Sequence, residues 1–436
     1  MQTIIIELSK YMIILFMLIY TFECFSVFRH TREATRKKIY FRQNIWMFFI
    51  QTLSYLVLLL VKQEIKIILF YFVQIIIIGA VIVLYRVLYP FANRLVLNNM
   101  CMLLAIGFII LTRISYAKAL RQFSIAAITL AIGMFVPYFF KKFKYFDRLT
   151  IVFALFGVTL LTLVLVFSRV INGSKLNVSI FGVTFQPSEI IKISFVFAIA
   201  GLLYKSQTIK DVIISAACAG THVIILVLSK DLGTAVLFFA VYFAMLYVAT
   251  RKLYYYLFGF LSGAIASVIG YYLFSHVRVR VQAFLDPLGH IETSGFQVSQ
   301  SLFAIGTGGY FGMGIGQGAP SNIPVVEADF IFSAICEEFG VVFGICLILI
   351  CVSCLVMFLN IAMRFNNIYY KLIAVGIAVS YGFQVFLTIG GVTKFIPLTG
   401  VTLPLVSYGG SSVFVSIIMF SIIQGMYIFV KEDGNK

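Results

Sequence analysis

Residues 65–89, IKIILFYFVQIIIIGAVIVLYRVLY, decide the fold class, because the 19 positions between Lys66 and Arg86 carry no charge. An α-helix rises about 1.5 Å per residue, so a run of this length crosses the roughly 30 Å hydrocarbon core of a bilayer. The run lacks the period-2 alternation of an outer-membrane barrel. Lipid offers the backbone no hydrogen-bond partners, so we expect a transmembrane helix.

The rest of the chain repeats this pattern. Of its 436 residues, 62% are apolar and 11% are charged, and the mean hydropathy is +1.05. Soluble domains are about half apolar and a quarter charged, which excludes a soluble protein. We predict an all-α, polytopic transmembrane helical bundle with thirteen spans. They lie near residues 4–28, 44–61, 65–89, 95–114, 119–140, 147–170, 185–204, 211–229, 232–250, 253–275, 329–359, 370–391 and 402–430.

The basic residues predict the orientation. If loop 29–43 is cytoplasmic, alternate loops place 20 of the 33 Lys and Arg residues on that side and 12 on the other, with Lys192 inside a span. The positive-inside rule then places the N-terminus outside and the C-terminus in the cytoplasm. The rule also explains the net charge of +17, so nucleic acid is not an expected partner. The first residues lack a basic n-region, so no cleaved signal peptide is expected.

One long segment, at about residues 276–328, joins two predicted spans on the outer face. Connections of this length are usually functional or disordered. This one is too apolar and aromatic for disorder, so we expect it to pack against the membrane face.

Ionisable side chains within or at the ends of spans are functional candidates, because burying a charge in hydrocarbon costs about 3 kcal/mol or more. Six such residues gather near the predicted outer surface: Glu189, Lys192, Lys230, Asp231, Asp329 and Lys394. They predict a polar cavity open to the outside. The alternative is that Glu189 with Lys192, and Lys230 with Asp231, are ion pairs that only pack helices. Asp329 has no adjacent basic residue and is the strongest candidate.

Other chemistries have little support. The glycine-rich stretch 306–318 lacks the Gly-Lys-Ser/Thr of a phosphate loop. The four histidines have no metal-ligand spacing, so no metal site is predicted. Cys351 and Cys354 have redox-motif spacing but lie within a span, where packing is the expected role.

Six motifs in chain order resemble those of the SEDS family of cell-wall polymerases, the FtsW/RodA/SpoVE group, over roughly residues 94–430. They are Phe185-Gln-Pro-Ser-Glu189 with Lys192, Asp231-Leu-Gly-Thr-Ala235, Arg280-Val-x-x-Phe-Leu-Asp286-Pro287, Gly295-Phe-Gln-x-x-Gln300-Ser301, Asp329-Phe-Ile-Phe with Glu337-Glu338-x-Gly340, and Pro397-x-Thr-Gly-Val-Thr-Leu-Pro404-x-Val-Ser407-Tyr-Gly-Gly-Ser411-Ser412. One departure is Glu327-Ala328 where many members have His-Thr before the aspartate.

The resemblance implies a ten-span core over residues 91–436, preceded by an extension of about three spans over residues 1–90. It implies a polymerase that joins lipid II into peptidoglycan glycan strands on the outer face of the bacterial cytoplasmic membrane. The product serves cell shape, division or sporulation, and the usual partner is a class B penicillin-binding protein that cross-links the strands. The family's essential aspartate maps onto Asp329, and its cavity pair maps onto Glu189 and Lys192.

This chemistry needs a base on the attacking hydroxyl and positive charge on the diphosphate leaving group. We expect Asp329 to be the base. The expected substrate-binding residues are Glu189, Lys192, Arg280, Lys394, Gln300, Ser301 and Asp231. No cofactor is required by the sequence, although a divalent cation, Mg or Mn, stays an option for the diphosphate.

Two rival functions are a flippase for lipid II and a non-catalytic scaffold for a transpeptidase. A flippase would place its polar residues near the midplane, whereas here they gather at the outer side. A scaffold would not need Asp329 or the cavity charges.

Overall fold

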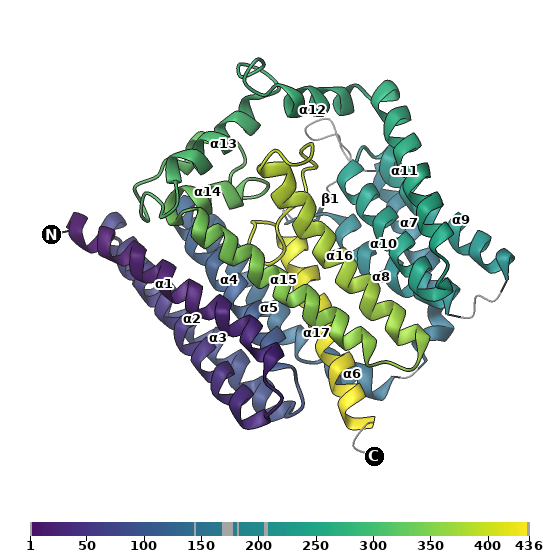
Figure 1. Ribbon diagram of the computed structural model, residues 1–436, viewed down its shortest axis with the longest axis horizontal. Coiled ribbons are helices and arrows are strands. Elements are labelled where there is room, and N and C mark those ends of the chain that lie inside the picture. Colours follow the sequence, from purple (N-terminus) through teal and green to yellow (C-terminus); the bar gives the residue numbers. More distant parts are fainter. Residues whose placement is uncertain (1, 144, 168–177, 181–182, 205–207, 434–436) are drawn as a thin grey trace.

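Helices account for most of the backbone that the computed structural model describes, which is residues 2–143, 145–167, 178–180, 183–204 and 208–433 (Figure 1). The all-α prediction is therefore confirmed. The first half of the chain forms α1 (Gln2–Arg29), α2 (Glu33–Lys62), α3 (Ile65–Leu88), α4 (Arg94–Ile114), α5 (Tyr116–Gly133), α6 (Val136–Lys142), η1 (Phe146–Leu149), α7 (Thr150–Phe167), α8 (Pro187–Leu203) and α9 (Ile209–Leu228). The second half forms α10 (Leu232–Thr250), α11 (Leu253–Leu273), α12 (Ser275–Leu285), α13 (Phe296–Gly308), η2 (Pro320–Asn322), α14 (Ile331–Phe339), α15 (Val341–Met363), α16 (Ile368–Val392) and α17 (Gly410–Asp433).

A small antiparallel hairpin precedes α8. Its strands are β1 (Val178–Ile180) and β2 (Val183–Phe185), and Val178 pairs with Phe185. The end of the predicted 147–170 span falls at residues 168–170, outside the described residues.

Twelve helices of the described chain are long and apolar enough to cross a membrane. The prediction of thirteen spans is one higher, and the difference is α8. This helix has 17 residues and is about 26 Å long, slightly shorter than a full span. It nevertheless packs inside the bundle against α7, α10 and α16.

Two predicted spans differ from the structure, one in its continuity and one in its starting residue. The 329–359 segment is two helices, α14 and α15, which meet at Gly340. Gly340 has a φ of 88°, and a Cβ there would lie 2.4 Å from the carbonyl oxygen of Tyr310, so the turn needs glycine. The predicted 402–430 span begins eight residues late, at Gly410, because the preceding loop binds other segments: the Tyr408 amide donates to the Glu327 carbonyl.

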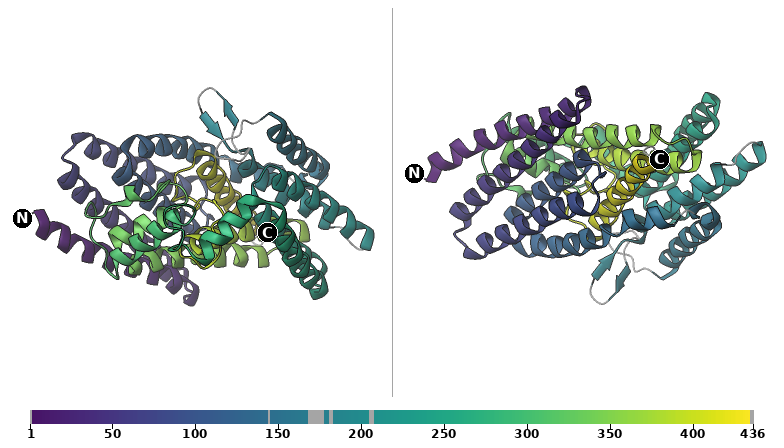
Figure 2. Two further views of the ribbon diagram at one scale, coloured as in Figure 1. Left: turned by 90° about the horizontal axis from the view of Figure 1, so that it is seen from above. Right: turned by 90° about the horizontal axis from the view of Figure 1, so that it is seen from below.

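Among the candidate spans α4 is the most deeply buried, since every residue from Leu95 to Thr112 is buried. On one flank, α1 packs on α15 and α2 packs on α4 (Figure 1). On the opposite flank lies α11, in which Gly259 is the one buried residue. The views along the bundle show these two flanks at its far ends (Figure 2). Apolar side chains on the flanks are exposed, as expected for surfaces that face lipid.

The predicted outer segment 276–328 is folded. It contains α12, α13 and η2, which lie across one end of the bundle (Figure 1). The N-terminus lies at this end, hereafter the α12 end, and the C-terminus lies at the opposite end. This relation agrees with the odd number of spans predicted from the apolar runs, while the side that faces the cytoplasm stays a prediction.

Candidate active site

Asp329 lies in the turn that precedes α14, at the α12 end of the bundle. Arg280 of α12 approaches it from across the 393–409 loop, which joins α16 to α17. The Arg280 Nη1 atom donates to the carbonyl oxygens of Leu398, at 3.2 Å, and Thr399, at 2.9 Å. A Cβ on Gly400 would lie 3.5 Å from Arg280 Nη2 and 3.7 Å from Asp329 Oδ2, so both charged groups border this glycine.

The surroundings of Asp329 change its acidity. Burial raises the pKa of the Asp329 carboxyl to about 6, against the opposing effect of the Arg280 charge, and the Glu327 charge raises it further. No basic residue is adjacent to Asp329 in the sequence, and the fold brings Arg280 near it from a distant segment. A carboxyl with a pKa near the working pH is suited to accept a proton.

Glu189 and Lys192 form a buried ion pair on α8, with Lys192 Nζ 2.6 Å from Glu189 Oε2. Lys192 also donates to Gln384 Oε1 at 2.7 Å, and Gln384 Nε2 donates to the Thr402 carbonyl at 2.9 Å. The ion pair that the packing alternative requires is therefore present. Through Gln384, the pair is therefore linked to the loop that leads into α17.

Asp231 is the N-terminal cap of α10. Its carboxylate accepts from the Thr234 amide at 3.2 Å and from the Ser188 hydroxyl at 3.0 Å. Lys230 is exposed and has a φ of 62°. In the described part of the chain Lys230 and Asp231 do not form an ion pair, because Asp231 is turned inward to α8 instead.

The remaining predicted substrate-binding residues are Ser301, Gln300 and Lys394, and they differ in what they contact. The Ser301 hydroxyl lies 2.7 Å from the Ser333 hydroxyl and donates to the Val392 carbonyl at 2.9 Å, so it joins α13, α14 and α16. Gln300 is half-buried on α13. Lys394 follows α16 in a left-handed conformation, and none of the hydrogen bonds or ion pairs found among described residues joins it to Arg280 or Asp329.

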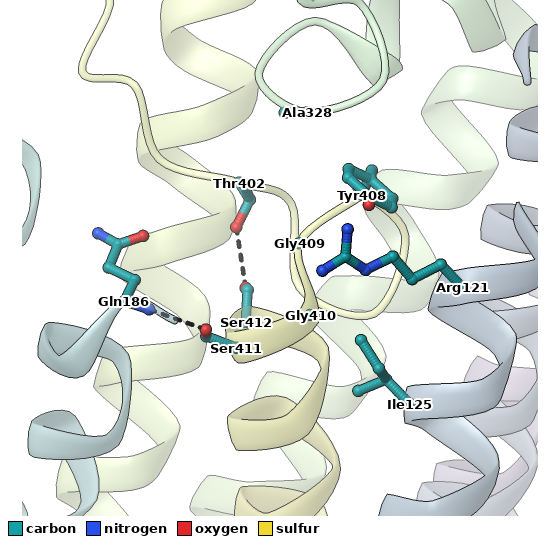
Figure 3. Close-up of a pocket in the computed structure, with 10 residues that line it drawn as sticks. All are labelled: Arg121, Ile125, Gln186, Ala328, Thr402, Tyr408, Gly409, Gly410, Ser411 and Ser412. Atoms are coloured by element: carbon teal, nitrogen blue, oxygen red, sulfur yellow. Dashed lines mark hydrogen bonds between the residues drawn. The ribbon is translucent and has the colours of Figure 1, made fainter. Parts of the chain in front are cut away.

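A cavity of about 240 Å³ opens beside this cluster (Figure 3). Ala328, the neighbour of Asp329, forms one edge, and the guanidinium group of Arg121 from α5 extends into it. The Gln186 backbone N–H donates to the Ser411 hydroxyl at 3.0 Å, and the Thr402 hydroxyl donates to the Ser412 hydroxyl at 2.8 Å. The lining residues are Arg121, Ile125, Gln186, Ala328, Thr402, Tyr408, Gly409, Gly410, Ser411 and Ser412.

The cavity is suited to an anion. Its floor is the N-terminus of α17, where backbone amides and the helix dipole attract negative charge. Arg121 adds a full positive charge, and the Ser411 and Ser412 hydroxyls can donate. None of these residues was among the predicted site residues. The signal that was available is the run Gly409-Gly-Ser-Ser412 at the start of a span, which is typical of anion-binding helix N-termini.

The chain is similar to known proteins over most of its length. The family model described as cell cycle protein, FtsW/RodA/SpoVE, matches residues 93–432. The peptidoglycan glycosyltransferase RodA of Mycobacterium leprae is 34% identical over 268 residues, which cover 58% of this chain and 58% of that protein. The probable peptidoglycan glycosyltransferase FtsW of Pseudoalteromonas translucida is 32% identical over 356 residues, 76% of this chain and 87% of that protein.

A solved structure supports the fold. A chain from a structure described as the structural coordination of polymerization and crosslinking by a peptidoglycan synthase complex superimposes with a TM-score of 0.67 at 24% identity. The match covers 78% of this chain and 99% of that chain.

Proposed function

Because this chain belongs to the FtsW/RodA/SpoVE family of cell cycle proteins, we propose that it is a peptidoglycan glycosyltransferase that polymerises lipid II and releases undecaprenyl diphosphate. The chain is a multi-pass membrane protein. The observation that carries the proposal is the position of Asp329, a carboxylate with a raised pKa that lies near Arg280 and next to a cavity suited to an anion. A base and positive charge side by side are what glycosyl transfer to a hydroxyl requires.

In the proposed reaction, Asp329 accepts the proton of the acceptor sugar's 4-hydroxyl. The hydroxyl oxygen forms a bond to the anomeric carbon of the donor, and the bond between that carbon and the diphosphate oxygen breaks. The electron pair leaves with the diphosphate. A single displacement of this kind converts an α-linked donor into a β-linked product.

The leaving diphosphate would bind to Arg280, to Arg121 and to the N-terminus of α17, with Lys394 approaching from the loop. Glu189 and Lys192 support this loop through Gln384. The other predicted substrate-binding residues, Asp231, Gln300 and Ser301, hold or flank the helices that form the walls.

A divalent cation, Mg or Mn, would enter with the diphosphate oxygens. Among the described residues, no three His, Cys, Asp or Glu side chains gather in a way that could hold a resident metal. Mg commonly binds through substrate phosphates with few protein ligands, so a cation of this kind is compatible with the cavity.

We also propose a membrane orientation and a partner protein for this chain. We place the α12 end outside a bacterial cytoplasmic membrane, so the N-terminus is external and the C-terminus cytoplasmic, as the distribution of basic residues favours. A class B penicillin-binding protein is the proposed partner. Support comes from the solved relative, whose description joins polymerization and crosslinking in one synthase complex.

The flippase alternative is disfavoured by the one-sided position of the charges. Asp329 and Arg280 both lie in segments at the α12 end, whereas a transport path would place its polar residues near the midplane. A scaffold without catalysis would not need the cavity.

The deciding experiment uses the full chain, purified alone and with its class B partner, and fluorescently labelled lipid II. We expect a ladder of glycan strands, which Asp329→Asn abolishes. Polymer formation by the Asp329→Asn protein at the wild-type rate would refute the proposal.

A further inference from the structure

At the α12 end of the bundle, α1 and α2 contact a glycine-rich segment, Gly309–Gly318, that leads from α13 toward Asp329 (Figure 1). Lys10 Nζ of α1 lies 3.4 Å from the Gly312 carbonyl oxygen, to which it donates. The Tyr11 ring lies 5.7 Å from the Phe311 ring, between centroids. The extension over residues 1–90, which the family model does not cover, therefore contacts the segment directly.

The contacts are close at two glycines. A Cβ on Gly316 would lie 2.7 Å from Val61 Cγ1 of α2, and a Cβ on Gly314 would lie 3.0 Å from Ile6 Cγ2 of α1. Both glycines have positive φ angles, 86° and 103°. A chain with this much glycine has many alternative conformations, so its ordering carries a large entropic cost that contacts must offset.

The opposite face of the segment lies against the end of α14. The Met313 and Gly314 amides donate to the carbonyls of Glu337 and Glu338, each at 2.9 Å. A Cβ on Gly312 would lie 2.3 Å from the Glu338 carbonyl oxygen. The segment is thus held between the extension and the carbonyl end of α14.

Side chains reinforce the same junction. Arg113, at the end of α4, donates to Glu338 Oε1 at 2.7 Å and to the Gly318 carbonyl at 2.9 Å. The Ala319 amide donates to Glu337 Oε1 at 3.0 Å. Lys62 of α2 donates to the Thr112 carbonyl at 2.8 Å, so α2 also binds the residue that precedes Arg113.

The junction is coupled to Asp329 by a short rigid element. All nine residues of α14 are buried, and the helix begins two residues after Asp329. A displacement at its glycine-bound end therefore moves the turn that carries the carboxylate, because a buried helix shifts as a unit.

We propose that α1 and α2 act as a clamp: they hold Gly309–Gly318 against α14 and so position Asp329 for proton transfer. Lys10 and Lys62 are positioning residues in this scheme, acting through the carbonyls of Gly312 and Thr112. The effect on catalysis depends on the proposed glycosyltransferase function, whereas the effect on the order of the segment does not.

The test combines Lys10→Met and Lys62→Met in the full chain, and Lys37→Met is the matched control. Lys37 lies on the same extension but pairs with Glu33 at 3.7 Å, on an exposed surface. Amide hydrogen exchange over residues 309–330 is measured together with kcat and KM for lipid II. We expect exchange to rise roughly five- to tenfold, the factor for losing a hydrogen bond that limits local opening.

We also expect kcat to fall several-fold with KM little changed, because the base is misplaced while the cavity is intact. Unchanged exchange would overturn the clamp even if the enzyme is active. Raised exchange with unchanged kcat would overturn the positioning of Asp329. If the wild-type chain makes no polymer, the glycosyltransferase proposal fails, and the exchange result still decides whether the clamp exists.

Discussion

Arg280 and Asp329 border the same glycine, Gly400, although they come from different segments and are joined by no ion pair closer than 4 Å in the described chain. Arg280 is held by the carbonyls of the loop on the other side. This arrangement lets the arginine influence the acidity of the carboxyl without neutralising it, so Asp329 keeps the ability to accept a proton.

Replacing Asp329 by Asn should lower the rate of polymer formation by roughly a hundredfold or more, the usual contribution of a general base. Glu327→Gln is the matched control, since Glu327 pairs with Lys118 and affects Asp329 only through its charge. Glycan ladders from labelled lipid II measure the effect. If both variants lose activity equally, the loss does not come from the base.

The pH profile of kcat/KM should have a rising limb near pH 6. Below that pH Asp329, with its pKa raised to about 6, is protonated and cannot accept a proton. Arg280 lowers the pKa of Asp329, so Arg280→Gln should shift the limb to higher pH. A shift to lower pH, or a limb that does not depend on residue 280, would contradict the assignment.

Lys192→Met should destabilise the protein in detergent by about 3–5 kcal/mol, because it leaves Glu189 buried without its partner. The double replacement Glu189→Gln with Lys192→Met should lose less than the single one. Thermal unfolding of the purified proteins measures both. Equal losses would show that the pair is not coupled.

Arg121→Met should weaken binding of inorganic pyrophosphate as an inhibitor by about tenfold, as expected for a charge-assisted contact to phosphate. Lys141→Met is the control, because Lys141 pairs with Glu432 near the C-terminus. An inhibition constant that stays the same in both variants would remove Arg121 from the anion site.

Chelation by EDTA should lower polymer formation, and added Mg or Mn should restore it, if the diphosphate carries a cation. The readout is the glycan ladder at fixed lipid II. Full activity in excess EDTA would show that arginine side chains and the α17 N-terminus are sufficient for the leaving group.

The order of motifs along the chain was enough to predict that Asp329, Glu189, Lys192 and Arg280 belong to one site. It was not enough to show what each contacts. Lys192 donates to Gln384, which lies 192 positions away in sequence. Arg121 was not among the predicted site residues, because nothing near it in sequence indicates that α5 and the start of α17 enclose a cavity.

By itself the sequence determined the transmembrane helices and the end of the bundle at which the charges gather. These properties follow from the local transfer of apolar and charged residues between water and lipid, which depends on each segment alone. Only the tertiary structure decided that Arg280 lies near Asp329 and that the predicted 329–359 helix is interrupted at Gly340. It also decided that α1 and α2 contact the glycine-rich segment Gly309–Gly318. Those features depend on close packing between segments distant in sequence, and no local pattern encodes that packing.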